Sequence, residues 1–205
     1  MTSYDFAISG QHYLFDVQSF AHTILAAGGD AYSYALLDRT TQGVIDDVAS
    51  GAAELGVIMQ TSTTEDALNS ALAEAGLAFH ELAVSAPLVA LPASHPFVNA
   101  KSLSLEQLAD FPYVYFDQGP DAPVAFFEEA LSEVPRAKKV ACTDRASLTE
   151  LIMAINGYTV TSGILVGITD GSALTTIPLE TDIKLHLGYV TADNRELSVM
   201  GERFV

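Results

Sequence analysis

The first part of the chain, up to Met59, alternates between short apolar runs and amphipathic segments, and this alternation limits the possible folds most. Apolar runs with strand character are separated by segments whose apolar side chains recur at helical spacing. We expect strands at Tyr4–Ser9, Tyr32–Leu37 and Leu55–Met59, and helices at His12–Ala27 and directly after Thr40-Thr41. This order of elements predicts right-handed crossovers and a parallel sheet.

The middle of the chain, from about Pro87 to Thr161, repeats the same order. Its expected strands are Ala83–Leu91, Tyr113–Phe116, Lys139–Cys142 and Tyr158–Thr161, and its expected helices are Ser104–Ala109, Pro123–Leu131 and Ser147–Ile155. A chain that leaves one α/β unit, builds a second and returns has two lobes with a groove between them. We therefore predict an α/β fold of two Rossmann-like lobes with a central cleft, joined by two crossover segments.

The outgoing crossover is expected at the start of the stretch Leu82–Phe116. We place lobe I at residues 1–84 and 163–205 and lobe II at residues 85–162. Val84-Ser85-Ala86 is then the outgoing hinge, and Thr161-Ser162 is the returning hinge beside it. Thr63–Ala75 is expected to be a loop with a short helical turn. The returning chain is expected to form strands at Leu174–Leu179 and Ile183–Val190 and a helix at Glu196–Phe204.

Charge and composition exclude several kinds of partner. Asp and Glu number 26 and Lys and Arg number 9, so the formal net charge is −17. A chain this acidic repels phosphate backbones and is a poor nucleic-acid binder by itself. No basic leader and no apolar run of about 18 residues is visible, so we expect no membrane association. The single cysteine, Cys142, allows no intramolecular disulfide, which is compatible with a cytoplasmic protein.

Neither a catalytic motif nor a metal-ligand spacing is present in the sequence. The five histidines are scattered, and His95 precedes Pro96 in what we interpret as a structural turn. Cys142 ends an apolar strand and is interpreted as a packed thiol rather than a nucleophile. We expect no catalytic residue, no metal site and no cofactor.

Polar residues at the carboxyl ends of the predicted strands are the better candidates, because ligands of open α/β sheets lie just outside those ends. The expected ligand-binding residues are Ser9, Gly10, Gln11, His12, Arg39, Thr40, Gln60, Thr61, Asp117 and Gln118, together with Ser85, Thr161 and Ser162 on the crossovers. The loops after the first two strands lead into helices, whose free N–H groups favour a carboxylate or another anion.

Structural roles remain open for several of these residues. Ser9 and Thr40 could be helix caps or turn formers. Arg39 could pair with an anionic ligand or form an ordinary surface salt bridge. Asp117 could instead attract an amine or a hydroxyl-rich ligand, and Phe116 is expected in the core of lobe II.

Three runs of sequence together resemble the effector-binding domain of LysR-type transcriptional regulators. The first is Val48-Ala49-Ser50-Gly51 followed by Glu54-Leu55-Gly56-Val57-Ile58, in which Glu54 replaces the family's usual Asp. The second comprises Leu88–Pro92, His95-Pro96, Leu103–Leu108 and Phe111–Val114, in which Phe97 replaces the usual Leu. The third is Leu148–Gly157 with Tyr158–Gly163, in which Thr159 replaces a Gly.

The resemblance implies one effector-binding domain over residues 1–205, with a periplasmic-binding-protein-like fold. It implies a small-molecule effector between the lobes, for which we expect a carboxylate-bearing or aromatic metabolite. It also implies a homodimer or tetramer with antiparallel pairing. DNA would be contacted only through an N-terminal helix-turn-helix domain that this chain lacks, so the chain is expected to be a truncated segment or a lone sensor. The alternatives are a solute-binding protein of a transporter and an enzyme on the same fold.

Overall fold

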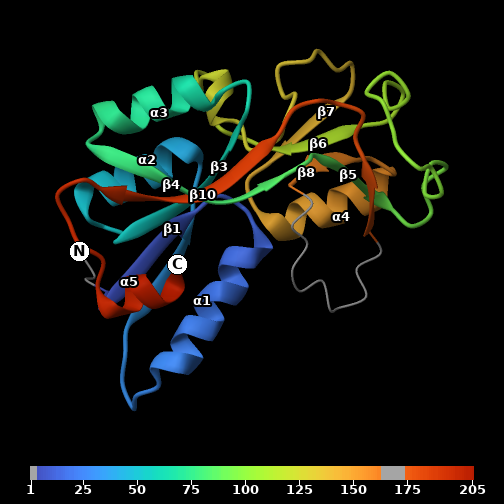
Figure 1. Cartoon of the computed structure of the whole chain (residues 1–205). Coiled ribbons are helices and arrows are strands. Elements are labelled where there is room, and N and C mark those ends of the chain that lie inside the picture. Colours follow the sequence, from blue (N-terminus) through green and yellow to red (C-terminus); the bar gives the residue numbers. More distant parts are fainter. Residues whose placement is uncertain (1–3, 163–173) are drawn as a thin grey trace.

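The computed structural model describes residues 4–162 and 174–205, which form two α/β lobes side by side (Figure 1). The first lobe is built around a five-stranded sheet with the order β2-β1-β3-β10-β4. Its strands are β1 (Phe6–Gly10), β2 (Tyr34–Asp38), β3 (Leu55–Thr61), β4 (Leu77–Ser85) and β10 (Leu185–Ala192). β1 is parallel to β2 and β3, as expected, whereas β10 is antiparallel to both β3 and β4.

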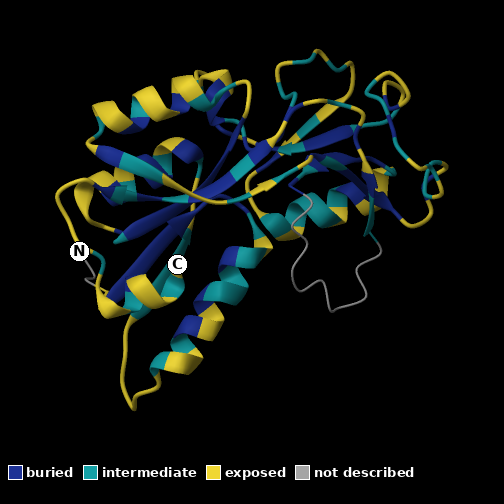
Figure 2. Cartoon of the chain, viewed as in Figure 1, coloured by how far each residue is buried: buried dark blue, intermediate teal, exposed yellow. Residues whose placement is uncertain are grey.

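Helices cover both faces of this sheet. On one face α2 (Thr41–Ser50) and α3 (Glu65–Glu74) bury apolar side chains such as Val44 and Leu68 against β3 and β10. On the other face lie α1 (Leu14–Ala27) and α5 (Val199–Phe204), and Phe20 packs against β1 (Figure 1). Figure 2 shows the strands buried beneath the exposed outer faces of the helices. Within the described ranges, no helix is long and apolar enough to cross a membrane.

Among its described residues, the second lobe contains two small sheets and one α-helix. β5 (Leu88–Pro92) lies between β8 (Thr159–Thr161) and β9 (Leu174–Pro178) in an antiparallel sheet. β6 (Tyr113–Phe116) and β7 (Lys139–Cys142) form a parallel pair, and α4 (Arg145–Ile155) packs against this part of the lobe. Backbone hydrogen bonds at Tyr158 join the sheets, because its carbonyl accepts from the Val114 N–H at 2.8 Å.

The chain returns to the first lobe later than expected. The predicted boundary at residue 163 lies outside the described residues, but β9 pairs with β5 and therefore belongs with the second lobe. The chain rejoins the five-stranded sheet only at Leu185, the start of β10. The two crossing segments are thus 85–88 and 178–185, and the Leu179 N–H donates to the Pro87 carbonyl at 3.2 Å. Thr161-Ser162 is not the returning hinge, although the Ser85 hydroxyl does bind the Ser162 carbonyl at 2.7 Å.

Three further expectations about local structure are wrong. Residues 63–75 contain a ten-residue helix, α3. Its buried face consists mainly of Leu68 and Leu72, and two apolar residues give only a weak helical pattern in the sequence. The expected helix at Ser104–Ala109 is a series of turns. The expected helix at Pro123–Leu131 is reduced to one 3₁₀ turn, η1 (Val124–Phe126). The residues that follow η1 make contacts where the two lobes meet. These contacts outweigh the helical propensity of the segment.

Candidate functional site

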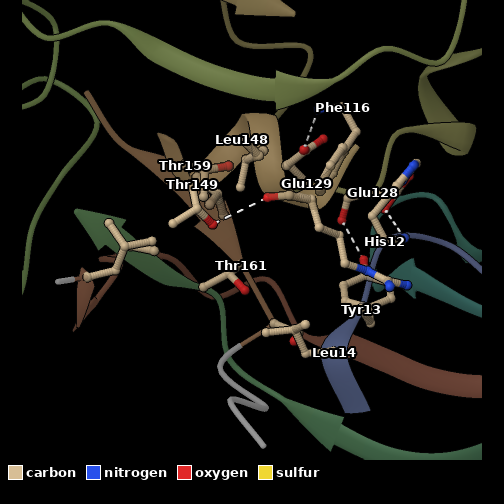
Figure 3. A pocket seen from close by; sticks show the side chains of 15 residues that line it. His12, Tyr13, Leu14, Phe116, Glu128, Glu129, Leu148, Thr149, Thr159 and Thr161 are labelled. Carbon is tan, nitrogen blue, oxygen red and sulfur yellow. Dashed lines mark hydrogen bonds and ion pairs between the residues drawn. The ribbon is translucent and has the colours of Figure 1, made fainter. Parts of the chain in front are cut away.

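A cavity of about 120 Å³ lies where the second lobe meets the start of α1 (Figure 3). The first lobe contributes His12, Tyr13 and Leu14 to its lining. The second lobe contributes Ala90, Phe116, Glu128, Glu129, Arg145, Leu148, Thr149, Thr159, Val160, Thr161, Ser162 and Leu174. Apolar walls with a few convergent polar groups are the usual composition of a small-molecule site.

The anion-binding position at the start of α1 is filled by the chain's own carboxylate, that of Glu128. Its Oε2 accepts from the His12 backbone N–H at 2.9 Å, and its Oε1 lies 2.8 Å from His12 Nδ1 and accepts from Gln118 Nε2 at 2.8 Å. Both side chains of the His12–Glu128 pair are almost fully buried. A carboxylate thus lies where the sequence predicted one, but it comes from the protein.

The Glu128 carboxylate favours the protonated form of His12. Burial alone would lower the pKa of His12, but the hydrogen bond and charge of Glu128, with the charge of Asp38, outweigh burial and raise the pKa. The imidazole also stacks on Phe116, with ring centroids 4.1 Å apart. His12 is therefore a bridge between the lobes as well as part of the cavity wall.

The start of α2 is likewise occupied from the second lobe. Gln118 Oε1 accepts from the Thr41 backbone N–H at 2.8 Å, and the Thr41 hydroxyl donates to the Phe126 carbonyl at 2.7 Å. Gln11 donates to the Thr41 hydroxyl and accepts from the Met59 N–H at 2.8 Å. Gln11 and Gln118, both expected to bind ligand, therefore have protein partners: Gln118 joins the lobes through Thr41, whereas both side-chain partners of Gln11 lie in the first lobe.

Arg145, the first residue of α4, connects the second lobe to two carboxylates of the first. Its Nη2 donates to Asp38 Oδ1 at 2.7 Å and lies 3.3 Å from Asp16 Oδ1. Asp16 is fully buried, and burial raises its pKa to about 7 although the charge of Arg145 works in the opposite direction. A Cβ at Gly10 would come within 2.5 Å of Asp16 Oδ2, so only glycine fits there without displacing this carboxyl.

Glu129 is the second buried carboxyl in the described cavity lining, beside Glu128, and the sequence prediction missed it. Its Oε1 accepts from the Phe116 backbone N–H at 2.9 Å, whereas its Oε2 has no hydrogen-bond partner among the described residues. Burial and the charge of neighbouring Glu128 raise the pKa of Glu129 to about 8, despite the opposing hydrogen bond from Phe116. Glu129 is therefore largely protonated at neutral pH. The hydroxyl of Thr159, in the same lining, also lacks a partner in the described chain.

Of the residues expected to bind ligand, His12, Thr161 and Ser162 line the cavity. Ser9 and Arg39 instead bind Asp47, and Thr40 caps α2 by accepting from the Gly43 N–H.

The remaining expected residues lie outside the lining. Thr61 binds Thr63 and Thr64, and Gln60 lies inside β3 rather than after it. Asp117 is exposed and accepts from the Gly119 N–H. Nothing in the sequence marked Glu128 and Glu129 as site residues, because 123–131 was predicted to be a helix. Arg145 lies one residue beyond Thr143-Asp144, which follow a predicted strand. The expectation that ligand-binding residues follow strand ends therefore nearly includes it.

Solved structures with the same fold come from regulators of transcription. The reduced form of the OxyR regulatory domain from Pseudomonas aeruginosa superposes with a TM-score of 0.64 at 13% identity, covering 92% of this chain and 87% of that chain. The effector binding domain of QuiR, in complex with shikimate, gives 0.63 at 12% identity, covering 97% and 92%. Full-length CbnR complexed with its target DNA gives 0.65 at 14% identity, covering 97% of this chain and 67% of CbnR. At such identities the likeness shows the fold alone.

Sequence comparison identifies the family. No match is found among curated protein sequences. The family described as the LysR substrate binding domain matches residues 33–205, from just before β2 to the end of the chain. The matched region contains the three runs that carried the resemblance in the sequence. The chain therefore belongs to the LysR substrate binding domain family.

Proposed function

We propose that this chain is the sensing part of a LysR-type transcriptional regulator and that it binds a small-molecule effector in the cavity between its lobes. The proposal rests on the residues that line the cavity. They come from the start of α1 in one lobe and from α4 and β8 in the other. A ligand in this cavity touches both lobes, so its affinity depends on how the lobes are placed. The solved QuiR domain, described as a complex with shikimate, supports a small-molecule role for this fold.

The signal would arise from a change in the contacts that now join the lobes. Gln118 bonds to Thr41, Glu128 to His12, and Arg145 to Asp16 and Asp38. An effector that fits one lobe arrangement better than another shifts the population toward that arrangement. We propose that the shift passes to an N-terminal helix-turn-helix domain outside this chain, through a homodimer or tetramer in the cytoplasm.

Binding without turnover is the expected behaviour. The acidic chain is a poor partner for DNA, so the helix-turn-helix domain would make the DNA contacts. The solved complex of full-length CbnR with its target DNA supports this assignment. The family match favours a regulator over a solute-binding protein of a transporter. We expect the effector to be released unchanged.

Filling the cavity should weaken effector binding while the fold persists. Leu148 lines the cavity from α4, and Leu148→Phe places extra carbon atoms into a space of about 120 Å³. We expect ligands found by a thermal-shift screen of metabolites to bind this variant at least tenfold more weakly in calorimetry. Overpacking of this kind is expected to lower the free energy of unfolding by about 1 to 3 kcal/mol.

Met153→Phe is the matched control, because Met153 lies on the same helix and is exposed. This control should bind every ligand as the unchanged chain does. Ligands that bind Leu148→Phe as tightly as the unchanged chain would show that the effector site lies elsewhere.

A further inference from the structure

The carboxylate of Glu128 fills a position that is built to hold an anion. Three groups converge on it: the His12 backbone N–H donates to Oε2 at 2.9 Å, and both His12 Nδ1 and Gln118 Nε2 lie 2.8 Å from Oε1. His12 comes from the first lobe and Gln118 from the loop after β6 in the second. Hydrogen bonds to a charged acceptor are roughly twice as strong as neutral ones. The start of α1 therefore binds a carboxylate in this protein, and that carboxylate belongs to the chain itself.

Glu128 is also part of the cavity wall. Glu128 and His12 both line the cavity, and Figure 3 shows them side by side. The Glu128 side chain is only 2% exposed, and the Tyr13 hydroxyl holds its backbone by donating to the Glu128 carbonyl at 3.1 Å. A ligand that enters the cavity would therefore meet a wall in which the anion position is already occupied.

The cations of the cavity are paired with acids of the chain as well. Among the described lining residues, the cationic side chains are Arg145 and His12. Arg145 faces Asp16 and Asp38, and His12 faces Glu128. Arg145 Nε has no partner among the described residues, but this atom is buried and two carboxylates already lie beside the guanidinium. A ligand carboxylate would thus be repelled by several acids that already share these two cations.

We propose that Glu128 is a specificity-determining residue: its carboxylate takes the place of a ligand carboxylate, so that the cavity selects effectors without one. The inference deepens the proposed function and rests on it, because it concerns the selectivity of the same cavity. It narrows the expected effector, a carboxylate-bearing or aromatic metabolite, to a compact molecule without a carboxylate. The volume of about 120 Å³ agrees with such a ligand, since a cavity of roughly 150 Å³ accepts benzene.

Replacing Glu128 by alanine should turn the position into a binding site for acetate. Alanine keeps the Cβ atom, and acetate supplies the methyl carbon and the carboxylate that replace Cγ and Cδ, so the three donors regain their acceptor. Acetate and the neutral acetamide are each titrated by calorimetry into the 205-residue chain and into the variant, at pH 7 and constant ionic strength. We expect acetate to bind Glu128→Ala at least tenfold more tightly than the unchanged chain, and at least tenfold more tightly than acetamide binds the variant.

The titration of His12, followed by NMR, gives a readout that a general effect of acetate on stability would not move. In the unchanged chain burial lowers the pKa of His12, and Glu128 with Asp38 outweighs burial and raises it. Arg145 acts in the opposite direction, and Asp144 also interacts with the charge of His12. Only Glu128 changes in the variant, so the pKa of His12 should fall in Glu128→Ala, and saturating acetate should raise it again.

Glu74→Ala is the matched control, because it removes an exposed carboxylate of α3; it should bind acetate no better than the unchanged chain. Equal affinities of Glu128→Ala for acetate and acetamide, or no binding of acetate by this variant, would overturn the inference. Should Glu128→Ala fail to fold, Glu128→Gln keeps the size of the side chain, and a pKa of His12 that does not fall in this variant would overturn the inference instead.

The proposed function is tested separately by Leu148→Phe. If metabolites lose affinity in Leu148→Phe but acetate does not bind Glu128→Ala, the cavity is the effector site and only the role of Glu128 is wrong. A carboxylate metabolite that binds the unchanged chain and loses affinity in Leu148→Phe would likewise contradict the selectivity while supporting the site.

Discussion

Replacing Arg145 by methionine should lower the free energy of unfolding by about 3 to 5 kcal/mol at pH 8, the cost of removing one partner of a buried ion pair. Asp16 is completely buried, and in the variant it keeps no cation beside it. Asp38 loses its 2.7 Å contact with the guanidinium at the same time. Because the pKa of Asp16 is about 7, the carboxyl can take up a proton instead, and the loss should shrink toward pH 5. Urea unfolding at both pH values measures the difference.

Arg39→Met is the matched control for this prediction. Arg39 also pairs with an aspartate, Asp47 at 3.0 Å, but its side chain is 46% exposed. An exposed pair of this kind contributes less than about 1 kcal/mol. The double variant Arg145→Met, Asp16→Asn should recover most of the stability, since no buried charge remains unpaired. Equal losses for Arg145→Met and Arg39→Met would contradict the assignment of Arg145 as the cation that joins the lobes.

Replacing Glu129 by glutamine should stabilise the chain at neutral and alkaline pH and flatten its stability profile. The folded state holds the Glu129 proton up to a pKa of about 8, whereas the unfolded chain loses it at the ordinary value of 4.5. Between these values the folded state binds the extra proton, so stability falls as pH rises, by about 1.4 kcal/mol per pH unit for one group. Asp16, with a pKa of about 7 in place of 3.8, adds to the fall in the same direction.

Melting temperatures from about pH 5 to pH 8 test this prediction. Glu129→Gln should lose less stability over that interval than the unchanged chain, and the remaining slope should come from Asp16. Glu74→Gln, on the exposed face of α3, is the control and should leave the profile unchanged. A profile of Glu129→Gln that runs parallel to that of the unchanged chain would mean that Glu129 is ionised in the folded protein.

Periodicity predicted the fold well where local pattern and tertiary contacts agree. The β1-α1-β2-α2-β3 unit was found because its strands are continuous apolar runs and α2 has a clear apolar face ending at Gly51, whose φ of 78° suits glycine. Residues 123–131 have helical composition, but Glu128 and Glu129 bind backbone N–H groups of His12 and Phe116 instead. Such distant partners leave no trace in local periodicity, so the segment was predicted wrongly.

The partners at the candidate site could not be predicted from the sequence. The expectation that ligand-binding residues follow strand ends pointed to the starts of α1 and α2, where hydrogen-bond acceptors do lie. It could not show that Glu128 and Gln118 of the second lobe already supply those acceptors. Nor could it show that Arg145, placed at the start of α4 where the helix dipole disfavours a cation, is stabilised by Asp16 and Asp38. These pairings depend on how the two lobes meet.

A crystal structure of the chain with its tightest-binding metabolite tests the central claim most directly. The account predicts electron density inside the cavity, in contact with His12 or Tyr13 on one lobe and with Leu148 or Thr159 on the other. Density on an outer face of either lobe, with the cavity unchanged, would contradict the claim that this cavity is where the domain senses its effector.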